Sequence, residues 1–312
     1  MLCPLCDSDL LNTRRGHNNC PKCRTEVLSV GDAASAYPDS YYGSTTAKFS
    51  GAAGRARRFW HAGRARRLRQ RFAATASPIV YDIGCGDGEF LAACLDNGFD
   101  VRGCEPVDRP RRQAEQRLGC TLDVEAFSVN ESGRYDVITA WQVIEHMPLP
   151  AQFLRAAYDN LVPNGILAVS TVNIDSLQAA LFGSYWLHLD PPRHLWVGSR
   201  PAVESLVDRC GFDIIDRVWN HLEFGPIGYV DSAINLVDSR RDRLLHCLKN
   251  GFHGVTSKAL WLVAAALTPV GIMLSAAESA AGRSATFELY ARRRSSDDGA
   301  PTQERPTDGT HR

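Results

Sequence analysis

The chain has 312 residues, of which 44% are apolar, and this length suits one full-size domain with a small addition. Its 35 basic and 35 acidic residues cancel, which argues against attraction of the whole molecule to nucleic acid or to an anionic membrane. Any such attraction must come from a local segment. The opening Met-Leu-Cys-Pro lacks the basic and apolar regions of an export signal, so we expect a cytoplasmic location.

Two Cys-Pro-x-Cys pairs lie near the N-terminus, Cys3 with Cys6 and Cys20 with Cys23. Such pairs present four thiolates to one tetrahedral ion, and their arrangement resembles a zinc ribbon. We therefore predict a zinc ribbon in residues 1–30 with a structural Zn²⁺ that replaces a hydrophobic core. Four unrelated thiols or a redox pair are the alternative. The other six cysteines are scattered singly, which is typical of a reducing compartment.

Residues 31–77 are expected to form a linker and an arginine-rich amphipathic helix. Between Ser40 and Tyr81 there are nine basic residues and no acidic one, a local charge of +9. The apolar residues of this segment are predicted to fall close to one helical face: Phe49, Phe59, Trp60, Leu68 and Phe72. The helix either lies solvated over the first strand or attracts the phosphates of a lipid, a nucleotide sugar or RNA.

From Ile79 onward, strands, glycine turns and helices alternate, a pattern typical of a parallel sheet with helices on its faces. The predicted strands are 79–83, 99–104, 121–125, 135–141, 165–172, 212–219 and 285–292. The predicted helices are 88–97, 108–118, 150–161 and 200–210. We thus expect an α/β fold over residues 78–294, with a doubly wound, seven-stranded, mostly parallel sheet and a helical insertion at 221–283. The polar residues 295–312 are expected to form a disordered tail.

A glycine-rich turn follows the first predicted strand, in the run Asp82-Ile-Gly84-Cys85-Gly86-Asp87-Gly88-Glu89. In a doubly wound fold, a nucleotide-like ligand lies there against bare backbone. The third glycine comes one residue earlier than in a dinucleotide fingerprint, and three carboxylates in this run would repel a pyrophosphate. They suit a ligand that carries ammonium and sulfonium charges, as S-adenosylmethionine does.

Four segments over residues 79–218 resemble, in order, the motifs of class I S-adenosylmethionine-dependent methyltransferases. They are the glycine turn, the acid Glu105 that ends the second strand, the stretch 135–147 and the stretch 161–169. The resemblance implies a Rossmann-like fold that binds S-adenosylmethionine, with Glu105 accepting hydrogen bonds from both ribose hydroxyls. The cofactor-binding residues implied in this way are Asp82, Gly84, Cys85, Gly86, Gly88, Glu105, Trp141 and Gln142.

Glu145 and His146 lie in a segment that is similar to that of quinone O-methyltransferases. His146 is the candidate general base, with Glu145 beside it, because an imidazole titrates near neutral pH and the motif follows the fourth strand. The alternative is a histidine that only fixes the loop. In that subfamily an acid three residues before the Glu-His pair can help to bind a divalent metal. Gln142 occupies that position here, so a catalytic metal is not expected.

An aromatic and titratable run at 185–196 follows the fifth strand and is expected to cover the acceptor pocket. It includes a Pro-Arg-His-Leu sequence that resembles methyltransferases with small or glycan-like acceptors. We assign acceptor binding to four of its residues, namely His188, Asp190, Arg193 and His194. The alternative is that the prolines and tryptophans of this run simply cap the sheet.

Residues 259–277 contain no charge, a length at the threshold for crossing a bilayer. Crossing is not expected, because the last strand must return to the same sheet. Pro269 and Gly271 interrupt the apolar run, which predicts a helical hairpin that either covers the fold or enters a membrane interface. Peripheral contact with the inner face of an anionic membrane is expected through residues 49–72 and 257–281.

The sequence therefore predicts an S-adenosylmethionine-dependent methyltransferase that methylates an oxygen atom of a small or lipid-linked acceptor. A surface-glycan sugar and a quinone-like ring are the acceptors considered. One alternative is an RNA methyltransferase that uses the zinc ribbon and the +9 segment, although the neutral total charge makes nucleic acid the weaker partner. A second alternative is a non-catalytic scaffold that binds S-adenosylmethionine.

Overall fold

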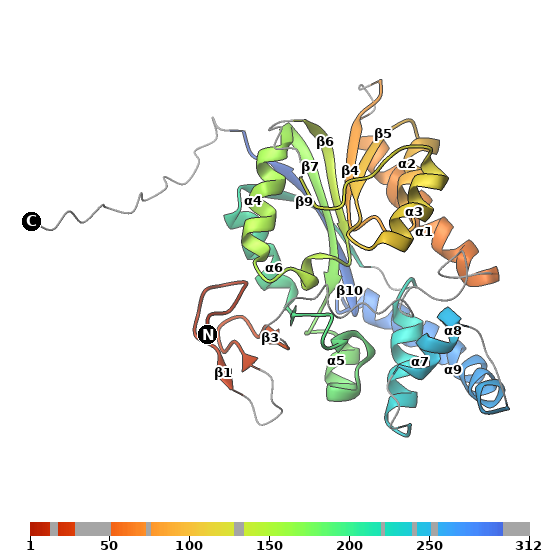
Figure 1. Cartoon of the computed structure of the whole chain (residues 1–312). Coiled ribbons are helices and arrows are strands. Elements are labelled where there is room, and N and C mark those ends of the chain that lie inside the picture. The colour runs from red at the N-terminus through yellow and green to blue at the C-terminus, as the bar shows by residue number, and fades with distance from the viewer. Residues whose placement is uncertain are drawn as a thin grey trace, which may run out of the picture.

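The computed structural model describes residues 1–12, 18–28, 51–72, 76–127, 134–219, 222–238, 242–250 and 255–295. The expected linker at 31–50 and the expected tail at 296–312 lie outside these residues. A six-stranded sheet in the order β5-β4-β6-β7-β10-β9 forms the centre of the molecule (Figure 1). Its strands are β4 (Ile79–Ile83), β5 (Asp100–Cys104), β6 (Tyr135–Trp141), β7 (Leu161–Val172), β9 (Phe212–Trp219) and β10 (Thr286–Arg293). The predicted α/β class is confirmed.

The order and direction of the strands determine where a ligand crevice is expected. The pairs β4–β5, β4–β6 and β6–β7 are parallel, whereas β10 is antiparallel to both β7 and β9. Five of the six strands therefore point the same way, as predicted. The chain passes from β4 to β5 on one side and then to β6 on the other side. In open α/β sheets, this divergence leaves a ligand crevice at the carboxyl ends of the two central strands.

The predicted strand at 121–125 is not part of the sheet, which has six strands in the described residues and not seven. Asp123 forms one isolated parallel bridge to Cys104. Leu122 is buried, but Val124 is 52% exposed, and Glu125 and Ala126 after it are exposed too. The segment therefore has too few buried side chains to pack as a longer strand. It leaves the sheet after a single bridge.

Helices cover both faces of the sheet. Consecutive residues of a strand point to opposite sides, and apolar residues on both sides need a covering layer. On one side, Val80 and Val137 pack in a cluster with residues of α1, α2 and α3. On the other side, Tyr81 and Ile138 pack in a cluster with residues of α4 and α6. The helices are α1 (Gly51–Arg71), α2 (Glu89–Asp96), α3 (Asp108–Leu118), α4 (Pro150–Asn160) and α6 (Arg200–Arg209). Each predicted helix agrees with its observed bounds to within one residue.

The apolar residues of α1 do not share one face, which corrects the sequence prediction. Leu68 is fully buried, whereas Phe59 is 61% exposed, and Trp60 and Phe72 are half-buried. Phe59 and Leu68 are nine residues apart, which is two and a half turns of a helix at about 3.6 residues per turn, so they point in opposite directions. Phe49 lies outside the described residues.

The N-terminal cysteine segment joins a second, four-stranded sheet in the order β1-β2-β3-β8. Its strands are β1 (Leu11–Asn12), β2 (Asn18–Asn19), β3 (Glu26–Val27) and β8 (Trp196–Val197). β3 is antiparallel to β8, which belongs to the loop that follows β7. Leu5 packs so closely on this loop that a Cβ atom on Gly198 would lie 2.5 Å from its Cδ1 atom. The segment and the loop therefore form one packed unit.

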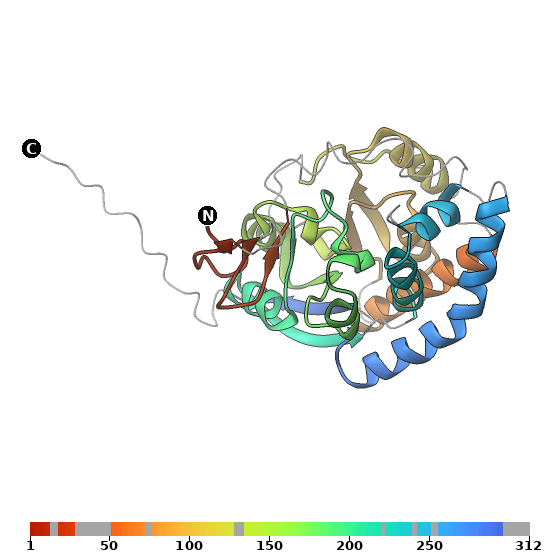
Figure 2. The same cartoon turned by 90° about the horizontal axis from the view of Figure 1, so that it is seen from below.

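The insertion between β9 and β10 contains α7 (Gly225–Asn235), α8 (Arg243–Asn250) and α9 (Val255–Ala280). The predicted hairpin is wrong, because α9 continues through Pro269 and curves around the outside of the molecule (Figure 2). Proline removes one helical hydrogen bond, and packing on both sides of it keeps the helix continuous. Leu260 packs with residues of α7 before the proline, and Gly271 lies against the Pro226 carbonyl after it. In the described residues, Ala259–Ala280 alone is long and apolar enough to span a membrane.

Candidate cofactor and acceptor site

The glycine turn between β4 and α2 lies at the carboxyl end of β4. Gly84, Gly86 and Gly88 all have positive φ values, of 66°, 58° and 74°. At Gly88 a side chain is also excluded by space, because a Cβ atom would lie 2.8 Å from the Cβ atom of Ala114 in α3. The turn thus requires glycine for its backbone conformation and for its contact with a neighbouring helix. The backbone N–H of Cys85 donates to Cys104, which fixes the turn to β5.

Glu105 connects the end of β5 to the glycine turn. Its two carboxylate oxygens accept hydrogen bonds from the backbone N–H groups of Gly86, at 2.9 Å, and Val107, at 3.0 Å. The side chain is buried. The structure thus brings Glu105, the residue predicted to bind the ribose, next to the glycine turn predicted to bind the cofactor.

Asp82 lies beneath the turn and inside the protein. Its side chain is buried and accepts a 2.6 Å hydrogen bond from the hydroxyl group of Thr139 in β6. Burial raises the pKa of Asp82 to about 7, although the bond from Thr139 opposes this shift. This carboxyl group links the two central strands at the base of the crevice.

The other two acids of the turn are paired with cations, which sequence reasoning missed. Arg57 of α1 contacts both Asp87 and Glu89 at 2.5 Å, and Arg117 of α3 lies 3.4 Å from Asp87. These guanidinium groups neutralise the carboxylates that were expected to attract a cationic ligand. Asp87 and Glu89 are therefore not the uncompensated charges that the sequence predicted for a cationic ligand. Arg57 could not be singled out among eight similar arginines of the segment.

A second arginine of α1, also missed, lies within the crevice region. Arg64 is buried, contacts Glu223 at 2.5 Å and Glu288 at 2.8 Å, and stacks over the ring of Trp141 at 4.6 Å. The Trp141 Nε1 and His61 Nδ1 atoms are buried and have no hydrogen-bond partner in the structure. Both rings pack against Phe90, at 5.3 and 6.0 Å. Orphaned buried polar atoms beside a glycine turn fit a site that a bound ligand completes.

Gln142 directly follows β6 and lies in the left-handed backbone region, with a φ value of 56°. Its backbone N–H and its side-chain Nε2 both donate to the Ser170 hydroxyl group of β7, at 3.0 and 3.1 Å. The residue therefore fixes the loop between β6 and the short helix η3 (Ile144–His146) to the neighbouring strand.

Glu145, His146 and His194 form a cluster beyond the ends of β6 and β7. Glu145 is fully buried, and its Oε2 atom accepts a 3.0 Å hydrogen bond from Thr171. Its Oε1 atom has no hydrogen-bond partner and lies 3.9 Å from His194 Nε2. Burial raises the pKa of Glu145 to about 8, so this carboxyl group is protonated at neutral pH. One potential ligand atom from each of the three side chains lies within 4.8 Å of the others.

The tautomers of both histidines follow from their hydrogen bonds. His146 Nδ1 lies 2.7 Å from the carbonyl oxygen of Arg193, and His194 Nδ1 lies 2.8 Å from that of His188. A carbonyl oxygen only accepts, so both Nδ1 atoms carry the proton and Nε2 is the basic atom of each neutral ring. Burial lowers the pKa of both imidazoles. His146 is therefore neutral and able to accept a proton at Nε2 near pH 7.

The four predicted acceptor residues separate into different environments. Arg193 forms an ion pair with Asp190, so both charges are satisfied within the loop. His194 joins the cluster with Glu145. His188 packs toward α7, where a Cβ atom on Gly228 would lie 2.8 Å from His188 Nε2. Burial lowers the pKa of His188 to about 4.

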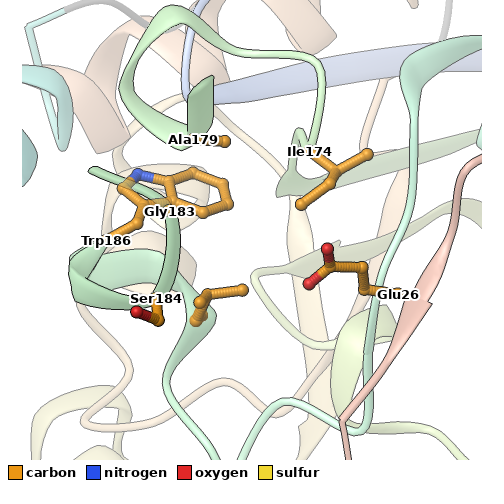
Figure 3. A pocket seen from close by; sticks show the side chains of 7 residues that line it. Glu26, Ile174, Ala179, Gly183, Ser184 and Trp186 are labelled. Carbon is orange, nitrogen blue, oxygen red and sulfur yellow. The ribbon is translucent and has the colours of Figure 1, made fainter. Parts of the chain in front are cut away.

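A small, partly open pocket lies between β3 and the segment that contains α5 (Leu177–Phe182) and η5 (Leu187–Leu189) (Figure 3). It is lined by Glu26, Ile174, Ala179, Gly183, Ser184, Trp186 and Leu189. Figure 3 shows the carboxylate of Glu26 turned toward the pocket, opposite Trp186. The pocket is thus shared by the N-terminal segment and the predicted acceptor loop.

The four N-terminal cysteines converge as predicted. Their Sγ atoms lie within 4.8 Å of one another, and the Sγ atom of Cys6 is 3.4 Å from the Sγ atom of Cys20 and from that of Cys23. All four thiols are free, at separations far longer than the roughly 2.05 Å of a disulfide. Four thiolates at about these separations fit a tetrahedral Zn²⁺ ion with ligand bonds of about 2.3 Å.

The sheet order, the diverging connections and the glycine turn define a Rossmann-like protein with a crevice for a nucleotide-type cofactor. A family model described as a methyltransferase domain matches residues 55–217, which is more than half of the 312 residues. The chain belongs to this methyltransferase domain family, as its motifs indicated.

Comparison with known proteins agrees with this family. The chain is 31% identical over 128 residues to a ubiquinone biosynthesis O-methyltransferase of Acinetobacter baylyi, covering 37% of this chain and 54% of that protein. It is 36% identical over 108 residues to the protein of the same name in Psychrobacter arcticus, covering 31% and 42%. The chain thus spans about half the length of these curated relatives.

A solved structure shows the same fold. Phosphoethanolamine N-methyltransferase 2 of Haemonchus contortus, in complex with S-adenosyl-L-methionine, superposes with a TM-score of 0.50 at 14% identity, covering 75% of this chain and 53% of that chain. The insertion with α7, α8 and α9 and the cysteine segment both lie outside the residues that the family model matches.

Proposed function

We propose that the protein is an S-adenosylmethionine-dependent methyltransferase that methylates an oxygen atom of a small or lipid-linked acceptor. The observation that carries the proposal is the position of the cluster formed by Glu145, His146 and His194. Its first two members follow closely after Val143, the residue that packs against Gly84 of the glycine turn. Among the acceptors considered, a quinone-like ring is favoured over a glycan sugar, because the curated relatives are named for ubiquinone biosynthesis. A lipid-linked acceptor also implies contact with an anionic membrane, which we assign to residues 49–72 and 257–281.

The glycine turn, Glu105 and Trp141 are the groups that would hold S-adenosylmethionine, which supplies an electrophilic methyl group when bound. The turn offers backbone that a ligand can approach without meeting side chains. Trp141 Nε1 offers a buried donor that has no hydrogen-bond partner among the residues that the structure describes. The packing of α1 over Trp141 and Phe90 excludes water from this side of the crevice.

His146 is proposed as the group that accepts the proton of the acceptor hydroxyl. Its Nδ1–H bond to the Arg193 carbonyl orients the ring and leaves Nε2 as the basic atom. The pair of Arg193 with Asp190 holds the loop that provides this carbonyl. Glu145, protonated and buried, is proposed to position His194 next to His146. The centroids of the two imidazole rings are 4.9 Å apart.

The cysteine site is proposed to hold a structural Zn²⁺, because four thiol ligands leave no coordination position for a substrate. A cytoplasmic location is proposed from the free thiols, and a peripheral position on the inner face of the membrane from residues 49–72 and 257–281. The RNA methyltransferase alternative loses support, since Arg57, Arg64 and Arg71 of the basic helix form ion pairs within the protein.

The test is methyl transfer from labelled S-adenosylmethionine to a panel of catechol or quinol, sugar and RNA acceptors. We expect product with the phenolic acceptors. His146→Ala should lower turnover by about 10²-fold or more, as expected for loss of a general base, and leave cofactor affinity unchanged. His246→Ala, which changes a histidine of α8 outside the site, is the matched control. Transfer to RNA alone would reject the proposal, and cofactor binding without any transfer would favour a scaffold.

A further inference from the structure

The outer surface of α9 is apolar and exposed over most of the helix. Eight large apolar side chains have exposed fractions between 37% and 63%. They are Trp261, Leu262, Val263, Leu267, Val270, Ile272, Met273 and Leu274. By sequence, residues 259–277 include no charged residue. An apolar patch that is continuous over several helical turns marks a surface with a partner.

The contact of α9 with the rest of the protein is narrow. Its buried residues form one stripe, in which Gly271 packs on the Pro226 carbonyl and Ser275 packs on Gly225. A Cβ atom on Gly271 would lie 3.0 Å from the Pro226 oxygen, and one on Gly225 would lie 2.6 Å from Ser275 Oγ. These small residues bring α9 close to α7 and leave the large side chains on the opposite surface. The exposed patch is therefore fixed in place.

A basic and aromatic surface accompanies this patch. Arg55, Arg58, Phe59 and Arg66 of α1 are exposed, and their spacing places them on one side of the helix. They are distinct from Arg64, Arg67 and Arg71 of α1, which form ion pairs with the sheet, although Arg58 also lies 3.8 Å from Glu89 of α2. Both views show α1 and α9 on the same side of the molecule (Figures 1 and 2). An exposed apolar helix surface, with exposed arginines and an aromatic ring on another helix of the same side, matches the chemistry of an anionic bilayer surface.

We propose that α9 lies in the plane of an anionic bilayer, with its exposed side chains in the acyl boundary and the exposed arginines of α1 near the headgroups. A second copy of this chain would oppose the same arginines, whose like charges repel, so the bilayer is the occupant that the charges favour. The inference rests on the proposed function only in that it provides access to a lipid-linked acceptor.

An orientation in the membrane plane follows from how the ends of α9 are attached. The helix of 26 residues is about 39 Å long at about 1.5 Å per residue. After it, the chain enters β10, which lies between β7 and β9 in the central sheet. On its inner side, α7 packs both before and after Pro269. A spanning helix would have to lose these contacts, whereas a helix in the plane retains them.

The test is flotation of the full-length protein with vesicles of phosphatidylcholine alone or of phosphatidylcholine with phosphatidylglycerol. We expect flotation with the anionic vesicles, weakened by salt and by Arg55→Gln with Arg66→Gln. Leu262→Glu with Met273→Glu should reduce binding more than about tenfold, because charged side chains do not enter the acyl boundary. Leu181→Glu with Val237→Glu is the matched control, since both of these residues are exposed, at 66% and 87%, outside α9.

A second readout reports depth. Brominated lipids should quench the fluorescence of the wild-type protein, and Trp261→Phe should remove most of this quenching. Flotation is measured without turnover, so its failure removes the membrane contact assigned to residues 49–72 and 257–281 but leaves the proposed methyl transfer intact, and absence of turnover leaves this inference intact. Absence of flotation, equal binding to neutral vesicles, or equal loss in the control variant would overturn the inference. So would a dimer in sedimentation that the α9 variant converts to a monomer.

Discussion

The protonation state of Glu145 provides a direct test of the site, through the variant Glu145→Gln. Burial raises the pKa of this carboxyl group from 4.5 to about 8, so between these values the folded protein holds a proton that the unfolded chain has lost. The free energy of unfolding must then fall as pH rises through this window, by about 1.4 kcal/mol per pH unit. Glutamine has a similar shape and does not ionise, so the variant lacks this contribution. We expect the stability of the variant relative to wild type to increase by about 3 kcal/mol from about pH 5.5 to about pH 7.5.

The assay is urea denaturation of both proteins at the two pH values, without added divalent ions. Asp82, whose pKa is also raised, to about 7, is present in both proteins, so its contribution cancels in the difference. Glu204→Gln is the control, because Arg217 and Arg200 lower the pKa of Glu204 and keep it ionised across this range. A difference between wild type and Glu145→Gln that stays within about 0.5 kcal/mol at both pH values would refute the reasoning. It would mean that Glu145 is ionised in the folded protein, as it would be beside a bound cation.

Three further predictions concern the crevice and the cysteine site. Arg64→Leu removes the guanidinium group between Glu223 and Glu288. We expect urea denaturation to show that the free energy of unfolding falls by about 3–5 kcal/mol. A fall below about 1 kcal/mol would contradict a buried ion-pair network. Gly88→Ala, at a φ of 74°, should weaken S-adenosylmethionine binding about tenfold or more by calorimetry, and unchanged affinity would remove the turn from the cofactor site. Cys20→Ser should abolish a stoichiometric zinc signal and lower the melting temperature, and a metal-free protein of unchanged stability would exclude a structural zinc.

Local patterns predicted the central fold well because each element buries its own regular set of side chains. The run Tyr135–Trp141 became β6 with the predicted bounds, since its apolar residues pack on both faces of the sheet. The cysteine pairs predicted their own convergence through spacing alone. The Glu145 and His146 motif was placed at the end of β6, but its third member, His194, came together with it only through the fold.

The failures came from interactions that link distant segments. The eight arginines of α1 look alike in sequence, yet Arg64 is buried between two carboxylates. These partners, Glu223 and Glu288, are 159 and 224 residues away in the chain and meet Arg64 only in the fold. Pro269 predicted a break, and contacts with α7 kept the helix continuous. Phe59 is exposed and Leu68 is buried because nine residues of helix place them on opposite sides of α1, so the predicted common face is wrong.

The pairing of β3 with β8 makes the N-terminal segment part of the site's own framework. Leu28 donates to the carbonyl of Leu195, and Leu195 in turn donates to the carbonyl of Glu145, so a chain of backbone bonds runs from the cysteine segment to the residue before the candidate base His146. A chain shortened to its methyltransferase match would leave β8 as an exposed edge, open to pairing with other molecules. The cysteine segment therefore cannot be exchanged or removed as an independent module, and variation in it would be felt at His194, two residues before β8 begins.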